Sequence, residues 1–140
     1  MNNPKELQAR FPYQFEGEAI GMSHSRGWFR LFSRLCSDID QALGEDKRGF
    51  HWLQVKEKFG SARMYFRLAE GVHEQEPELM KQLMDLKFAA EAASQDICAA
   101  CGRPGWIDQR TGWMLSLCGK HHQERLDDTL GSVWFEEDEL

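Results

Sequence analysis

The chain of 140 residues lacks any apolar run near the roughly 20 residues that a membrane-spanning helix requires. Its first residues also lack the apolar core of a signal peptide, so we expect a soluble cytoplasmic protein without membrane contact. Internal repeats and low-complexity segments are missing as well. A content of 41% hydrophobic and 29% charged residues is typical of one globular domain, alone or with a small added module.

Sequence signatures of common catalytic sites are also missing. There is no glycine-rich phosphate loop, no G-x-S-x-G, no H-E-x-x-H, and no carboxylate pair in a setting that would separate two pKa values. The sequence therefore marks no small-molecule substrate, and we expect that the protein is not an enzyme. An enzyme whose site leaves no pattern in the sequence stays an alternative.

Positive charge is scarce in the C-terminal half. Residues 1–68 carry 11 Lys and Arg against 8 Asp and Glu, whereas residues 69–140 carry 6 against 15. An acidic half that ends in F-E-E-D-E-L is a poor partner for phosphate backbones. If the protein binds nucleic acid, we expect the N-terminal half to make the contact.

Only four cysteines are present, and their distribution is uneven. Cys36 lies alone in an apolar helix pattern, where we expect a small buried thiol. The other three lie in the last third of the chain, in short pairs that are typical of a reduced metal site and unlike a secreted disulfide framework.

These three cysteines and one histidine form two pairs of metal ligands. Cys98 and Cys101 read C-x2-C, and after sixteen intervening residues Cys118 and His121 read C-x2-H. Because each pair places two soft ligands on one side of a tight turn, the two pairs together can hold one tetrahedral Zn²⁺. His122 is the alternative fourth ligand, since C-x3-H is also tolerated. Four protein ligands leave no open position, so we predict a structural rather than a catalytic ion.

The residues around these ligands predict a treble-clef-like module. Gly102 allows a turn after the second cysteine, residues 106–108 and 113–117 predict a hairpin around residues 109–112, and a last helix runs from Cys118 to Leu130. Nucleases of the HNH type resemble such a module, but their first hairpin strand carries catalytic histidines. The corresponding strand here has none, so we do not expect a nuclease.

Helical periodicity marks two segments upstream of the module. Residues 1–24 show no sustained period and predict an irregular arm. Apolar spacing predicts a helix over residues 27–43, capped by Ser25, and a longer one over residues 77–95. The first helix also carries an arginine stripe on its other face, which we expect to be solvated, with the last arginine paired to Asp38. The stripe consists of Arg26, Arg30 and Arg34.

Two short strands are predicted between these helices. Phe50–Lys56 and Ala62–Leu68 flank the connection 57–61, in which Gly60 suits a positive φ. Simple alternation turns Leu53 and Val55 toward the core, with Met64, Phe66 and Leu68. The other face then presents Trp52, Lys56, Arg63, Tyr65 and Arg67. This basic aromatic face suits a protein partner or single-stranded nucleic acid, although ordinary cross-strand packing uses the same residue types.

These elements predict an α+β fold. A helix, a short antiparallel β-hairpin and a long helix occupy residues 1–96 together with the arm, and residues 97–140 form the zinc module with its acidic tail. A segment of this size cannot bury enough apolar surface by itself, so we expect the metal to substitute for a core in the module.

Several motifs along the chain carry a resemblance. They are Q-V-K-E-K-F-G at 54–60, C-A-A-C-G-R-P-G at 98–105 and L-C-G-K-H at 117–121. Together they resemble a group of small, mostly uncharacterised bacterial and phage proteins, in which a QVKEKFG-type hairpin precedes a CxxCGxPG…LCxxH zinc module. The resemblance implies a similar layout over residues 27 to about 122, but no activity. Ser61 departs from the group, where a second glycine follows Gly60.

These features favour a non-catalytic, zinc-stabilised protein-binding module. One form would be an inhibitor or immunity-type protein that acts on a basic partner enzyme, because opposite charges speed association. The alternative is a nucleic-acid-binding zinc protein that uses the basic aromatic face.

Overall fold

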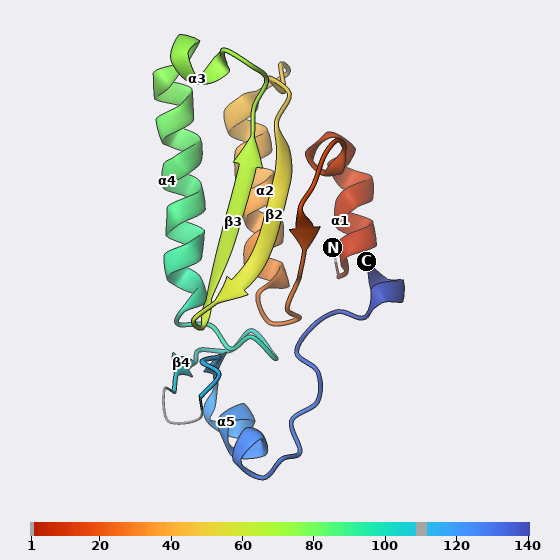
Figure 1. Cartoon of the computed structure of the whole chain (residues 1–140), viewed down its shortest axis with the longest axis vertical. Coiled ribbons are helices and arrows are strands. Elements are labelled where there is room, and N and C mark those ends of the chain that lie inside the picture. The colour runs from red at the N-terminus through yellow and green to blue at the C-terminus, as the bar shows by residue number, and fades with distance from the viewer. Residues whose placement is uncertain (1, 109–111) are drawn as a thin grey trace.

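The computed structural model describes residues 2–108 and 112–140 (Figure 1). The N-terminal part contains helix α1 (Pro4–Arg10), a 3-10 helix (Pro12–Phe15), strand β1 (Gly21–Met22), helix α2 (Phe29–Leu43), strands β2 (His51–Lys58) and β3 (Ser61–Arg67), and helices α3 (Val72–Gln75) and α4 (Pro77–Ser94). The C-terminal part contains strands β4 (Trp106–Ile107) and β5 (Ser116–Leu117), helix α5 (Gly119–Leu126) and a last 3-10 helix (Glu137–Glu139). The predicted α+β class is confirmed.

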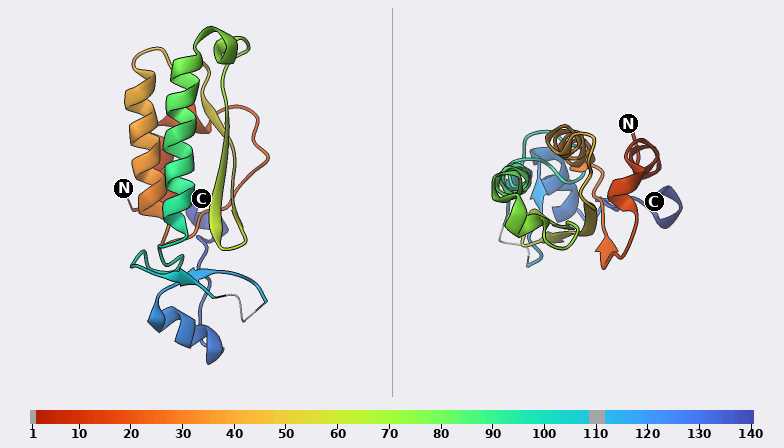
Figure 2. Two further views of the ribbon diagram at one scale, coloured as in Figure 1. Left: turned by 90° about the vertical axis from the view of Figure 1, so that its left-hand side faces the viewer. Right: turned by 90° about the horizontal axis from the view of Figure 1, so that it is seen from above.

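A three-stranded sheet in the order β1-β2-β3 forms the centre of the N-terminal part. β1 pairs with β2 in parallel, and β2 pairs with β3 antiparallel. α2 and α4 stand side by side along this sheet (Figure 2). Aromatic rings join α2 to the sheet, since the ring centroids of Phe32 and Trp52 lie 5.1 Å apart and those of Phe50 and Trp52 5.2 Å apart.

A β-bulge in β2 corrects the predicted faces of the hairpin. Trp52 pairs with Phe66, but Gln54 pairs with Tyr65, so Leu53 is an extra residue in β2. One inserted residue reverses the side-chain alternation before it. Trp52 therefore faces the core, where it is 1% exposed, and it does not belong to the basic aromatic face. Leu53, which simple alternation assigns to the core, is only half-buried.

The turn of the hairpin is also shorter than predicted. Both strands continue to Lys58 and Ser61, so only Phe59 and Gly60 connect them. Their φ angles are 54° and 86°, which is the left-handed pair that a two-residue type I′ turn requires. The twist of such a turn matches that of the strands, and this explains why they extend to its edges.

The predicted irregular arm is wrong in detail, because residues 2–24 contain two short helices and a strand. Asn3 caps α1, and its side chain accepts a hydrogen bond from the Glu6 N–H at 3.0 Å. The fully buried Gln14 accepts a hydrogen bond from Trp52 Nε1 at 3.1 Å and donates one to the Cys36 carbonyl at 3.0 Å. Elements of two to seven residues are too short to show a period in the sequence.

Side chains of α4 accept hydrogen bonds from backbone N–H groups on the outer edge of β3. Glu91 accepts a hydrogen bond from the Met64 N–H at 2.8 Å, and Ser94 Oγ accepts one from the Ala62 N–H at 2.8 Å. The buried Lys87 ammonium lies 3.3 Å from the Glu91 carboxylate. The edge strand is thus covered rather than left open to another chain.

The C-terminal tail returns to the N-terminal part. α5 ends at Leu126, earlier than predicted, because Asp128 takes a left-handed φ of 58° that stops the helix. Trp134 then forms a β-bridge with Ser25, and the Phe135 N–H donates to the His24 carbonyl at 3.0 Å. Figure 1 shows the tail passing from α5 back toward α1. No helix within the described residues is long and apolar enough to cross a membrane.

Candidate metal centre

The structure brings four of the predicted ligands together at the start of α5. The donor atoms of Cys98, Cys101, Cys118 and His121 all lie within 4.8 Å of one another. Cys101 Sγ and Cys118 Sγ are 3.8 Å apart. His121 Nδ1 lies 3.4 Å from Cys98 Sγ and 3.2 Å from Cys118 Sγ. Four close Cys and His side chains can bind one metal ion.

The separations between these donor atoms fit a tetrahedral ion. Zn–S bonds near 2.3 Å and Zn–N bonds near 2.0–2.1 Å place neighbouring ligand atoms roughly 3.5–3.8 Å apart. Three of the separations, from 3.2 to 3.8 Å, are close to this range, and all of them lie within 4.8 Å. Three sulfur atoms and one imidazole nitrogen are also the donor set of a Cys₃His site.

The neighbouring histidine has a different environment. His122 is buried, its Nε2 lies 2.8 Å from the Trp106 carbonyl oxygen, and the two rings have centroids 4.6 Å apart. His121 instead turns Nδ1 toward the sulfurs, while its Nε2 lies 3.4 Å from a Glu124 carboxylate oxygen. A carboxylate behind the imidazole holds the ring in a ligating orientation. The geometry therefore favours His121 over His122 as the fourth ligand.

The start of α5 favours the thiolate form of Cys118. Burial raises the pKa of this thiol, but hydrogen bonds from the His121 backbone and side chain outweigh burial and lower the pKa to about 7. Burial raises the pKa of Cys101, and the neighbouring thiols of Cys98 and Cys118 add to the effect. A bound cation would relieve this clustering, because it stabilises every thiolate at once.

Backbone hydrogen bonds shape the first ligand turn. The Cys98 N–H donates to the Arg103 carbonyl at 2.7 Å, and the Gly102 N–H donates to the Cys98 carbonyl at 2.9 Å. Gly102 has a φ of 81°, which few other residues adopt. The Ala99 N–H donates to the Ser116 carbonyl at 2.7 Å and so ties the turn to β5.

The turn that carries Cys98 and Cys101 packs against the start of α2 at Gly27. A Cβ atom at this position would lie 1.9 Å from the Cys98 carbonyl oxygen, so only glycine allows the contact. The Gly27 N–H donates to the Ala99 carbonyl at 2.7 Å, and Trp28 Nε1 donates to the Ile97 carbonyl at 2.9 Å. The sequence places Gly27 at the start of a predicted helix, but nothing in its pattern indicates that the ligand turn packs against it.

The hairpin tip makes a second contact with the metal module. The Ile107 side chain lies against Gly60, where an added Cβ would be 3.0 Å from it. Trp113 Nε1 donates to the Glu57 carboxylate at 2.5 Å. The predicted hairpin of the module is present as β4 and β5, and its connecting residues 109–111 lie outside the described part.

Comparisons with known proteins find no relative of this chain. The chain matches no protein-family model, no curated protein and no solved structure. The resemblance to small bacterial and phage zinc proteins therefore stays a prediction.

Four of the five predicted partner-binding residues do share one face of the sheet. Lys56 pairs with Arg63, and Tyr65 and Arg67 follow at two-residue steps along β3. Tyr65 is 40% exposed, but two ammonium groups already lie near its ring, with Lys56 Nζ 5.7 Å and Lys87 Nζ 4.8 Å from the centroid. Without Trp52, this face offers little aromatic surface for stacking.

Proposed function

We propose that the protein is a non-catalytic protein-binding module stabilised by one zinc ion. The observation that carries the proposal is the closed set of four donor atoms within 4.8 Å. Cysteine thiolates and imidazole select zinc among the common divalent ions, and a Cys₃His set leaves no position for a substrate. The ion then acts as a scaffold between the ligand turn, β5 and α5.

Exposed aromatic side chains support the binding part of the proposal. Phe59 at the hairpin tip is 66% exposed, and Trp106 and Trp113 of the metal module are 52% and 58% exposed. The contacts of Gly60 with Ile107 and of Glu57 with Trp113 join these two regions. Tyr, Trp and Phe are enriched in protein interfaces, and fixed rings lose little entropy on binding.

Charge supports a basic partner. The net charge of the chain is −6, and residues 69–140 contribute most of the acidic side chains. An acidic surface accelerates association with a basic protein, because the two fields attract before contact. We therefore infer an inhibitor or immunity-type role toward a basic enzyme as the most specific form of the proposal.

Zinc analysis tests the scaffold. Purified protein should contain about one zinc per chain by elemental analysis. Cys101→Ser should lose the metal and the ordered β4–β5–α5 region, whereas Cys36→Ser, which changes a cysteine remote from the ligands, should retain the metal. A metal-free chain that keeps the same melting curve would contradict the proposal.

Affinity capture tests the binding role. The zinc-loaded protein should retain a specific basic protein from an extract of its native host at physiological salt. The double variant Phe59→Asn/Trp113→Ser should lose that partner, whereas Phe88→Ser, which removes an aromatic ring that is 53% exposed on α4, should keep it. Retention of single-stranded nucleic acid instead, lost in Arg63→Ala/Arg67→Ala, would favour the nucleic-acid alternative.

A further inference from the structure

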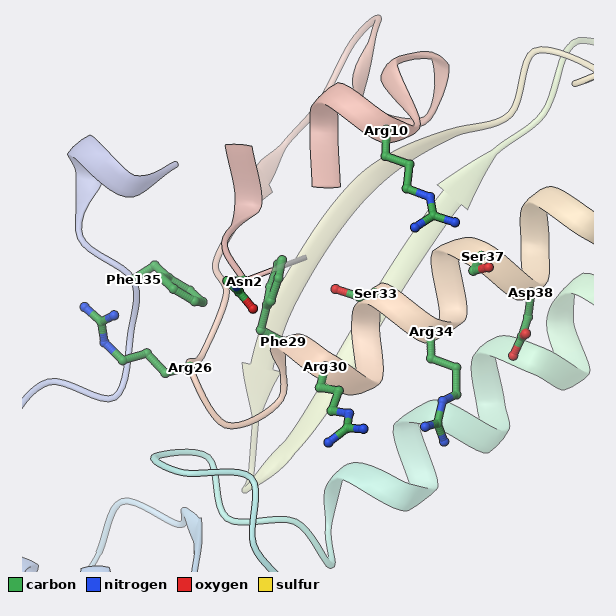
Figure 3. Close-up of a pocket in the computed structure, with 10 residues that line it drawn as sticks. All are labelled: Asn2, Arg10, Arg26, Phe29, Arg30, Ser33, Arg34, Ser37, Asp38 and Phe135. Carbon is green, nitrogen blue, oxygen red and sulfur yellow. The ribbon is translucent and has the colours of Figure 1, made fainter. Parts of the chain in front are cut away.

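A second site candidate lies away from the metal centre, in a cavity of about 580 Å³ between α1, α2 and the C-terminal tail (Figure 3). Four arginines line it against a single carboxylate, that of Asp38. The arginines are Arg10, Arg26, Arg30 and Arg34. Such an excess of positive charge is unexpected in a chain of net charge −6.

Two of these arginines have no charged partner. Neither Arg30 nor Arg34 forms an ion pair within residues 2–108 and 112–140, and the predicted pair of Arg34 with Asp38 is not formed. Figure 3 shows the Arg30 and Arg34 side chains leaving α2 next to each other, and Arg10 reaching from α1 toward α2. Their guanidinium groups therefore stay available to an anion.

A buried hydroxyl on the cavity wall is also without a partner. Ser33 is 8% exposed and lines the cavity, yet its Oγ makes no hydrogen bond within the described residues. An unsatisfied buried hydroxyl costs free energy, and a ligand that the Ser33 side chain turns to meet would recover that cost. Ser37, one turn further along α2, adds a second hydroxyl.

We propose that this cavity binds a phosphorylated small molecule. A phosphoryl group carries a charge of about −1.5 to −2 and three acceptor oxygens, which matches several guanidinium groups and a hydroxyl better than one carboxylate does. Arginine is suited to this task, because its planar fork binds phosphate oxygens in pairs. The site is independent of the metal centre and of the proposed protein-binding role.

The shape and charge of the region favour a small ligand over a nucleic-acid strand. The cavity volume lies within the roughly 300–1,000 Å³ range of small-molecule sites. Its end wall is apolar, since the rings of Phe29 and Phe135 pack edge to face with centroids 5.3 Å apart. A long polyanion would extend from the arginines toward the acidic C-terminal tail, which repels phosphates.

The acidic C-terminal tail would compete with a bound phosphate for one of these arginines. Arg26 donates to both carboxylate oxygens of Glu139, at 2.7 and 3.2 Å, and its guanidinium lies 4.9 Å from the Phe135 ring centroid. Arg26 thus binds the Glu139 carboxylate through two parallel hydrogen bonds, the bidentate geometry that we expect for a phosphate ligand. Removing the Glu139 charge should therefore strengthen binding.

Isothermal titration of the zinc-loaded full chain with pyrophosphate and with ADP tests the site. We expect saturable binding that weakens about 10-fold or more in Arg30→Ala/Arg34→Ala, since each lost charge-assisted hydrogen bond contributes substantially. Lys58→Ala/Lys81→Ala removes the same charge from surfaces outside the cavity and should change the affinity by less than about twofold. Ser33→Ala should weaken binding severalfold without lowering the melting temperature, and Glu139→Gln should tighten it about threefold or more.

Several results would overturn the proposal. They are the absence of saturable binding by both probes, equal losses in the two double variants, and equally tight binding of malonate, which would show a site for carboxylates. Tight binding of a thymidine 12-mer that pyrophosphate does not displace would instead assign the arginines to nucleic acid. Arg30 and Arg34 also border a small cavity next to Cys101, so the zinc content of each variant must stay at that of the wild type.

Discussion

Acidification should destabilise the fold through His24. This side chain is 4% exposed, it packs against the rings of Phe29 and Phe32, and its Nε2 has no hydrogen-bond partner within the described residues. Burial lowers the pKa of His24 to about 4 from an ordinary value of 6.5. Burial is the cause of this shift, and Lys56 is the charged side chain that lines the small cavity beside His24, with no carboxylate in that lining.

The sign and size of the effect follow from proton linkage. Between pH 6.5 and 4 the unfolded chain binds a proton at His24 that the folded chain excludes, so the free energy of unfolding falls as the pH is lowered. Above pH 6.5 the imidazole is neutral in both states, and this stability is fully present. Each pKa unit corresponds to 1.36 kcal/mol, which makes the full loss about 3 kcal/mol. Of this, about 1.3 kcal/mol should be lost between pH 7.5 and 5.5.

Urea denaturation of the wild type and of His24→Phe across pH 5.5–7.5 measures this loss. The Cys and His side chains of the candidate metal centre are the same in both proteins, so their contribution cancels in the difference. We expect the wild type to lose about 1.3 kcal/mol more than the variant over this range. His73→Gln, which alters an exposed histidine, should behave like the wild type. Parallel stability curves for the wild type and His24→Phe would refute the reasoning.

Three further predictions concern packing and metal. Gly27→Ala should lower the free energy of unfolding, measured by chemical denaturation, by about 3 kcal/mol, because the new Cβ would clash with the Cys98 carbonyl. Gly131→Ala places its Cβ in open space and should leave the stability unchanged. Glu91→Leu should lower the free energy of unfolding by about 3–5 kcal/mol, because it leaves the buried Lys87 ammonium without its carboxylate partner. Adding Lys87→Met to the same chain should recover part of this loss. A strong chelator should lower the melting temperature and weaken hydrogen-exchange protection at β5 and α5 first, and readdition of zinc should restore both.

The sequence predicted the main helices and the strand pair well. The apolar spacing of α2 and the proline at the start of α4 are local signals, and the observed bounds differ from the predicted ones by only a few residues. The four clustered candidate ligands were equally visible, because each pair spans only four positions and a tight turn suffices to bring its two side chains together.

Other features depended on contacts that no local pattern encodes. The bulge at Leu53 moved Trp52 into the core, and a bulge is a property of the pairing between two strands, here β2 and β3, that the residues of one strand do not reveal. The short helix α1 is stable because Leu7 is buried against the rest of the chain, since seven residues are too few to form a helix alone.

The sequence by itself determined the α+β class, the order of the main helices and strands and the two pairs of candidate ligands, because these depend on periodicity and on short spacing along the chain. Only the tertiary structure decided that Gly27 seats the metal centre and that Arg10 of α1 joins the arginine stripe of α2 around one cavity. Residues far apart in the chain meet through packing, and the geometry of that packing is a property of the whole fold rather than of any one segment.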